Sequence, residues 1–245
     1  MKRILLLALV VMPLMVSCDK EKEEIITVNL DASNLTDDGF FDGLLYYKII
    51  SNNPRQVTIF KIGDRDNITS VEIPSAIKID ANIYSCTGIG YAAFSGCRGL
   101  TSIEIPSSVT SIGDRAFYDC SGLTSIMIPS SVTSIGEWTF RACSGLKSIE
   151  IPSGVTSIGR AAFSDCSGLS SITIPESVTS IEDYAFTGCS GLLTISVFNS
   201  TPPSVTENSF EGLYSKVEVY VPKGSLSAYK NSSIWKSFST IIEME

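Results

Sequence analysis

A short repeat fills the middle of the chain and constrains its fold more than any other feature. Each copy holds a phenylalanine, followed three residues later by a cysteine and six residues later by a leucine. The phenylalanines recur at a constant interval, as Phe94, Phe117, Phe140, Phe163 and Phe186. A unit this short cannot bury its apolar side chains alone, so it must stack against the units before and after it. The repeat therefore predicts a solenoid.

Two short apolar pairs, the second of them present in four of the five units, indicate which residues point into the coil. Ile103 and Ile105 flank Glu104, which is the alternation expected of a strand with one buried face. Val109 and Ile112 form a second inward-facing pair. The rest of the unit is expected to form a short helical or irregular outer side. The predicted fold class is therefore a strand-rich α/β repeat.

Positions that should face solvent also line up from coil to coil, but their residue types vary. The candidate binding surface on the strands comprises Glu104, Met127, Glu150 and Thr173. On the opposite side of the coil, Trp138 and Tyr184 occupy equivalent positions two repeats apart. The strand residues could form a polar recognition surface or only a solvated face. The aromatic rings could stack on sugars, anchor a protein partner or pack on the outer shell.

The column of repeated cysteines, from Cys97 to Cys189, allows three chemical interpretations. A zinc site needs thiolates that converge on one point, whereas these cysteines recur once per coil along a line. Disulfides between neighbouring coils are geometrically conceivable but would disturb the uniform stacking. We expect a row of free thiols inside the solenoid, with Cys86 outside the register. No metal site and no cofactor are predicted.

Composition removes several classes of function. The formal net charge is −8, so the surface repels phosphate backbones and nucleic acid is a poor candidate partner. Histidine is absent, which excludes a Ser-His-Asp or Cys-His relay. Glu104 and Glu150 lie two coils apart, roughly 10 Å at strand spacing, on a face too open to desolvate them. Asp37, Asp38 and Asp42 lack the spacing of a calcium loop, so a solvated turn is expected there. No catalytic residue is predicted.

Residues 1–17 predict a secretory leader, because Lys2 and Arg3 precede a short apolar run. The end of that run resembles the lipobox of bacterial lipoproteins, with Cys18 as the lipidated residue; an ordinary leader cleaved elsewhere is the alternative. Residues 18–26 are expected to be an acidic tether, similar to the export signal of surface lipoproteins in the Bacteroidetes. The resemblance implies a lipid anchor in the outer membrane, facing the exterior, with no other membrane contact.

The sequence changes character on both sides of the regular repeats, which occupy residues 93–198. Residues 27–92 are predicted to form an N-terminal β cap with a degenerate first repeat, and residues 199–245 a C-terminal cap. The expected strands outside the repeats lie at 25–30, 44–50, 57–62 and 217–221. A helix is expected at 226–236, with Trp235 filling the open end of the core.

The repeat units, such as residues 116–129, resemble the BspA-type leucine-rich repeat family, and Val219 to Ser225 is similar to the closing segment of that family. The resemblance implies a right-handed solenoid on a cell-surface lipoprotein, with adhesion to host matrix proteins or to other bacteria. It implies no catalytic residues. We therefore predict a monomeric, non-catalytic recognition or adhesion module that binds a protein, with carbohydrate capture as the alternative.

Overall fold

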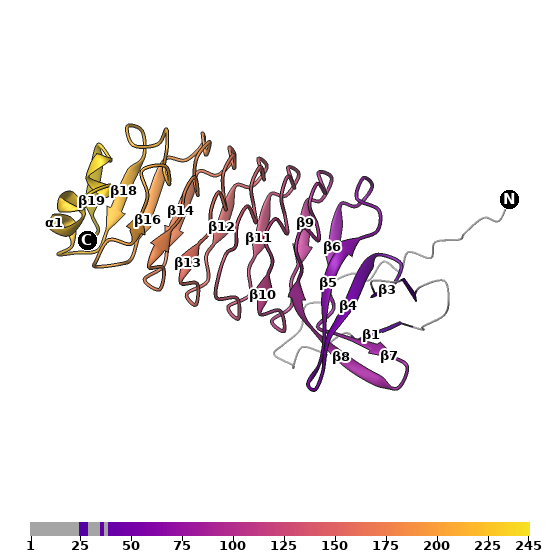
Figure 1. The fold of residues 1–245 in the computed structure, drawn as a ribbon. Coiled ribbons are helices and arrows are strands. Elements are labelled where there is room, and N and C mark those ends of the chain that lie inside the picture. The colour runs from indigo at the N-terminus through magenta and orange to yellow at the C-terminus, as the bar shows by residue number, and fades with distance from the viewer. Residues whose placement is uncertain (1–24, 29–34, 37–38) are drawn as a thin grey trace, which may run out of the picture.

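The computed structural model of the protein describes residues 25–28, 35–36 and 39–245 and shows a row of stacked coils (Figure 1). One short strand from each coil contributes to a ladder along the row. These strands are β6 (Ser70–Glu72), β9 (Ser102–Glu104), β11 (Ser125–Met127), β12 (Ser148–Glu150), β14 (Ser171–Ile174), β16 (Thr194–Val197), β18 (Glu218–Val221) and β19 (Thr240–Glu243). The paired strands are parallel, and Ser125 lies opposite Ser148 at the spacing of one repeat. The predicted solenoid is confirmed.

A second, narrower ladder follows the first in each coil. It contains β10 (Ser111–Ile112), β13 (Ser157–Ile158), β15 (Ser180–Ile181) and β17 (Ser204–Val205). Strand β13 pairs with β15 and β15 with β17, both in parallel, and Ile135 bridges to Ile158. Each coil is therefore built from two short strand segments joined by turns.

The α/β designation of the repeat is wrong. Within the described residues, the α-helix α1 (Leu226–Asn231) and the 3-10 helix η1 (Trp235–Ser237) both lie after the repeats. The outer segment of each repeat instead contains two residues with a left-handed backbone, such as Arg115 (φ 58°) and Asp119 (φ 58°). A left-handed residue interrupts a right-handed helix, so this side of the coil is a series of turns.

The interior of the solenoid is a stack of phenylalanine rings. Neighbouring ring centroids lie 5.3 to 5.5 Å apart and the ring planes are within 10° of parallel. The stack runs from Phe94 to Phe210, and all of its rings are buried. The sequence places Phe210 after the regular repeats because it follows Phe186 by one residue more than the regular interval, yet it continues the stack without a break. The apolar core therefore extends one coil beyond the predicted boundary.

The N-terminal region forms a mixed sheet that is continuous with the solenoid. Its strands are β1 (Ile25–Val28), β2 (Leu35–Thr36), β3 (Gly39–Phe41), β4 (Leu45–Asn52), β5 (Arg55–Ile62), β7 (Ala76–Ile79) and β8 (Asn82–Ile89). The strands expected at 44–50 and 57–62 are β4 and β5, which pair in antiparallel register as a hairpin. Strand β8 also pairs with β10, which joins this sheet to the second ladder.

One boundary of the N-terminal prediction needs correction. Strand β1 begins at Ile25, so the end of the expected 18–26 tether is part of the sheet. Ser70 pairs with Ser102, in the register expected of a degenerate first repeat, and the hairpin β7–β8 is the insertion that separates these two strands by more than one repeat. Asp42 accepts hydrogen bonds from the backbone of Leu44 and Leu45, as expected of a turn residue. Cys18, Asp37 and Asp38 lie outside the described residues.

The C-terminal segment also differs from the prediction. The strand expected at 217–221 is β18, but β19 follows it and is the last strand of the ladder. The helix expected at 226–236 is divided, because Ser232 has an extended backbone (ψ 147°) between α1 and η1. Trp235 is buried, its ring centroid lies 5.2 Å from that of Phe210, and its Nε1 donates a hydrogen bond to the carbonyl of Pro203. The indole therefore lies against the last ring of the phenylalanine stack.

Candidate functional site

The four strand residues of the predicted binding surface all point outward from the first ladder. Glu104, Met127, Glu150 and Thr173 are exposed, and Met127 is 81% accessible to solvent. Met127 lies directly opposite Glu150 on the neighbouring strand. We call this exposed side of the strands β9 to β16 the sheet face. Its two carboxylates, Glu104 on β9 and Glu150 on β12, lie on either side of β11 and are both exposed. The sheet face is therefore suited to surface contact, and these residues do not line a cleft.

The outer turns of five coils form a second surface, which we call the loop edge. It comprises residues 91–99, 114–122, 137–145, 160–168 and 183–191. Backbone hydrogen bonds connect each turn to the next one. The amide of Trp138 donates to Arg160 (2.9 Å), and the amide of Ala142 donates to Ser164 (2.8 Å). Because every turn is tied to its neighbours in this way, the loop edge presents its side chains from an ordered backbone.

Each turn of the loop edge holds two left-handed residues at fixed positions. The first column consists of Ala92, Arg115, Trp138, Ala161 and Tyr184, with φ between 50° and 61°. The second column consists of Gly96, Asp119, Ala142, Asp165 and Gly188, with φ between 58° and 77°. The two aromatic residues that the sequence singles out, Trp138 and Tyr184, therefore share one column, as predicted.

Trp138 is the centre of a group of arginine and aromatic side chains. The Arg115 guanidinium lies over its ring, 4.0 Å from the centroid, and the Arg141 guanidinium lies 5.5 Å from the same centroid. The Tyr118 ring is 6.5 Å away. Arg115 also donates a hydrogen bond of 2.7 Å to the hydroxyl of Tyr91 in the preceding coil. We call these five residues the Trp138 cluster.

Sequence reasoning missed this cluster. It identified Trp138 but predicted no contact of this residue with Arg115 or Tyr91. The signal that could have found the cluster is spacing, because Tyr91, Arg115 and Trp138 follow one another at close to the repeat interval. Side chains separated by one repeat lie side by side in a solenoid.

Tyr184 stands apart from the Trp138 cluster. Its ring is half-buried and has the Arg160 guanidinium 5.9 Å from its centroid. Ala161 occupies the position between Trp138 and Tyr184 in the column, and it is buried. The aromatic side chains on the surface of the loop edge therefore lie in two separate places.

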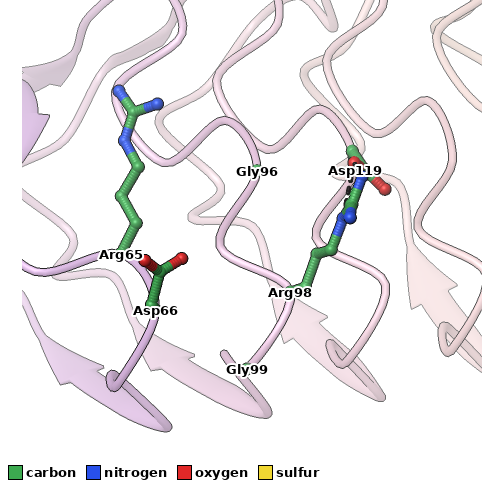
Figure 2. A pocket seen from close by; sticks show the side chains of 6 residues that line it. All are labelled: Arg65, Asp66, Gly96, Arg98, Gly99 and Asp119. Atoms are coloured by element: carbon green, nitrogen blue, oxygen red, sulfur yellow. Dashed lines mark hydrogen bonds and ion pairs between the residues drawn. The ribbon is translucent and has the colours of Figure 1, made fainter.

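A surface depression of about 240 Å³ lies near the start of the loop edge, and no pattern in the sequence indicates it. Figure 2 shows Arg65 and Asp66 on one side of Gly96, and the Arg98–Asp119 pair on the other. Arg98 donates to one carboxylate oxygen of Asp119 through Nε (2.9 Å) and through Nη2 (2.6 Å). The depression is smaller than ordinary ligand sites, and its two arginines are matched by two carboxylates.

The cysteines of the repeats are buried free thiols. Each thiol from Cys120 onward donates a hydrogen bond of 3.0 to 3.1 Å to a phenylalanine carbonyl in the preceding coil. Burial raises the pKa of Cys97 to about 11 and that of Cys143 and Cys189 to about 12. These thiols therefore join coil to coil and are poor nucleophiles. In the part of the chain that the structure describes, no group of three His, Cys, Asp or Glu residues is placed to hold a metal ion.

Comparison with known proteins identifies the repeat. The BspA type leucine rich repeat region matches residues 64–193 in six copies. A leucine-rich repeat protein from Bacteroides ovatus is 32% identical over 74% of this chain, with a TM-score of 0.59, and the chain spans 55% of that protein. The leucine rich repeat protein of T. pallidum shares the fold, with 23% identity over 81% of this chain and 92% of its own length and a TM-score of 0.61. No curated protein sequence matches the chain.

Proposed function

The chain belongs to the BspA-type leucine-rich repeat family, and from this we propose that it is a non-catalytic recognition or adhesion module that binds a protein through the outer surface of its solenoid. The partner would be a host matrix protein or a bacterial surface protein. The Trp138 cluster is the observation that carries the proposal. Tryptophan, tyrosine and arginine are the residues most often found at the energetic centre of protein interfaces, and here their positions are fixed before any partner arrives.

The proposed location is the outer membrane, with the solenoid anchored by a lipid on Cys18 and facing the exterior. The apolar run that stops at Cys18 and the charged residues after it support this location. None of the helices in the described part of the chain has the length and apolar character needed to cross a bilayer. The Cys18→Ala variant tests the anchor: it should leave the membrane fraction, and retention there would contradict lipidation.

We further propose that the solenoid is right-handed and monomeric, and that the segments at its two ends act as caps. Pairing of β8 with β10 supports this role for residues 27–92, and the contact of Trp235 with Phe210 supports it for residues 199–245. Caps of this kind would cover the apolar surface of the first and last coils, leaving the sheet face and the loop edge for binding.

The direct test is to measure binding of the purified chain to immobilised matrix proteins and to a glycan panel in parallel. Saturable binding to a protein, with no glycan bound, is the expected result. Binding to glycans alone would contradict the protein-binding proposal.

Capture of a carbohydrate is the second candidate, and one ring favours it. Tyr184 is half-exposed, with its nearest guanidinium 5.9 Å away, so a sugar could stack on it. Trp138 is a poorer platform, because Arg115 already lies over its ring. If the protein binds polysaccharide, Trp138→Ala and Tyr184→Ala identify the ring responsible, and binding that survives both changes would contradict this candidate.

A further inference from the structure

The two left-handed columns of the loop edge differ in the residues that they hold. The second column contains glycine and aspartate at four of its five positions, and these residues tolerate a left-handed backbone best. The first column contains no glycine, asparagine or aspartate. It instead holds Arg115, Trp138 and Tyr184, although a bulky residue with positive φ is an outlier.

Folding does not explain this difference. Ala92 and Ala161 occupy equivalent positions in the same column, so the coil forms without a large side chain there. Strained backbone that carries a bulky residue is characteristic of functional sites. We therefore infer that Trp138 serves a function other than folding.

Arg115 shows which chemical group the cluster would bind. Its guanidinium is held by the Tyr91 hydroxyl and by the Trp138 ring, both in neighbouring coils. Among the described residues, the ion pairs on the loop edge are Arg98–Asp119 and Arg141–Asp165, and neither involves Arg115. A guanidinium that is already oriented, and that is not in contact with a carboxylate, is suited to bind one with two parallel hydrogen bonds.

The acidic residues of the loop edge do not compete strongly for Arg115, because most of them already accept hydrogen bonds elsewhere. Asp114 accepts from the Glu137 amide, and Asp183 accepts from the Thr206 hydroxyl. Asp119 and Asp165 are the partners of Arg98 and Arg141. The Arg115 charge is thus available to an incoming group.

We propose that the Trp138 cluster is the contact point for a protein partner that presents a carboxylate beside an apolar side chain. The inference rests on the proposed function and specifies the face that performs it: the loop edge and not the sheet face. Arg115 would bind the carboxylate, and the rings of Trp138 and Tyr118 would exclude water around the apolar side chain. A sugar is disfavoured as the occupant because Arg115 already lies over the Trp138 ring.

The experiment is selection of a random displayed peptide library on the immobilised full chain, followed by affinity measurements with the enriched peptides. The expected peptides contain aspartate or glutamate next to an aliphatic residue. Trp138→Gly should weaken their binding at least about tenfold, as loss of an interface hot spot does. Arg115→Lys keeps the charge and loses the planar donor pair, so a smaller loss is expected. Met127→Ala on the sheet face is the matched control and should leave the affinity unchanged.

Three outcomes would overturn the inference. If enriched peptides lose affinity with Met127→Ala but keep it with Trp138→Gly, protein binding is supported and the sheet face is the site. If no acidic peptide is enriched but alginate, a carboxylated polysaccharide, binds with dependence on Trp138, the partner is not a protein. If neither the library nor alginate yields a binder, both the inference and the proposed function fail.

Discussion

The phenylalanine column and the Trp138 column recur with the same period, but they are built on opposite principles. The inner column repeats one residue type in every coil, and its rings are buried and stacked at 5.3 to 5.5 Å. The outer column changes from alanine to arginine, tryptophan and tyrosine on an unchanged backbone. In the inner column each ring must stack on the next, so the same residue is required in every coil. In the outer column the residue type can vary from coil to coil.

This difference separates the residues that fold the molecule from those available for binding. A close-packed interior tolerates little change in volume, because each ring contacts the rings of both neighbouring coils. The loop edge is held by backbone hydrogen bonds between turns, which depend little on the side chain. Substitutions should therefore act on stability in the inner column and on recognition in the outer one.

High pH should produce the largest change in the free energy of unfolding, because it acts on the buried thiols of all the coils at once. Burial raises the pKa of Cys97 to about 11 and that of Cys86, Cys143 and Cys189 to about 12, above the value in the unfolded chain. Stability is therefore complete below about pH 9 and is lost as the pH rises toward these folded values. Each such thiol should remove about 1.4 kcal/mol per pH unit in that range.

Urea unfolding at about pH 8 and about pH 10 measures this loss. Cys143→Ala serves as the control, since removing one titrating thiol should make the pH dependence shallower. A free energy of unfolding that stays constant across this range would contradict the buried thiol column.

Phe140→Ala should produce the next largest effect, because Phe140 lies in the middle of the stack between Phe117 and Phe163. Removing a buried phenylalanine costs about 3–5 kcal/mol, through lost burial and the cavity that remains. Chemical denaturation of the variant and the wild type at neutral pH gives this difference. A decrease in the free energy of unfolding of less than about 1 kcal/mol would show that the phenylalanine stack does not stabilise the solenoid.

Cys143→Ala at neutral pH should have an intermediate effect. The Cys143 thiol donates a hydrogen bond of 3.1 Å to the carbonyl of Phe117, which also accepts from the Cys120 amide (3.2 Å), so alanine removes one of two donors. We expect a loss of about 1 kcal/mol in the free energy of unfolding. Cys143→Ser is the comparison, because a hydroxyl can donate to the same carbonyl, and equal losses in the two variants would argue against a role for this hydrogen bond.

Trp138→Gly should have the smallest effect on stability. Glycine relieves the left-handed backbone, while the variant loses the Arg115 contact, which is worth about 0.5–1 kcal/mol at an exposed site. The two effects oppose each other, so thermal and chemical unfolding should differ from the wild type by less than about 1 kcal/mol. A larger loss would mean that the outer column also supports the fold.

The sequence predicts the interior of this molecule well because repetition reveals it. Identical residues at a fixed spacing must lie above one another in a solenoid, and this reasoning correctly predicts the phenylalanine stack and the buried cysteines. The coil that contains Phe210 was missed because its spacing is one residue longer than the repeat and Leu213 stands where the cysteine is expected. The hairpin β7–β8 was missed because an insertion has no period to reveal it.

The candidate site was only partly predictable, for a different reason. Trp138 and Tyr184 could be identified as equivalent positions on the outer side of the coil, and the structure places both in one column. The contact of Trp138 with Arg115 depends on a left-handed backbone that directs the two side chains toward each other. No local pattern in the sequence marks these positions as left-handed, because neither holds glycine or asparagine.

The most direct test of this account is the free energy of unfolding of a triple variant, Arg115→Gly with Trp138→Gly and Tyr184→Gly. The three substitutions remove every large side chain from the left-handed positions of the outer column. If the inner column folds the molecule and the outer one serves recognition, the triple variant should unfold within about 2 kcal/mol of the wild type, because glycine is suited to each backbone. A loss of more than about 4 kcal/mol would contradict the separation of the two columns.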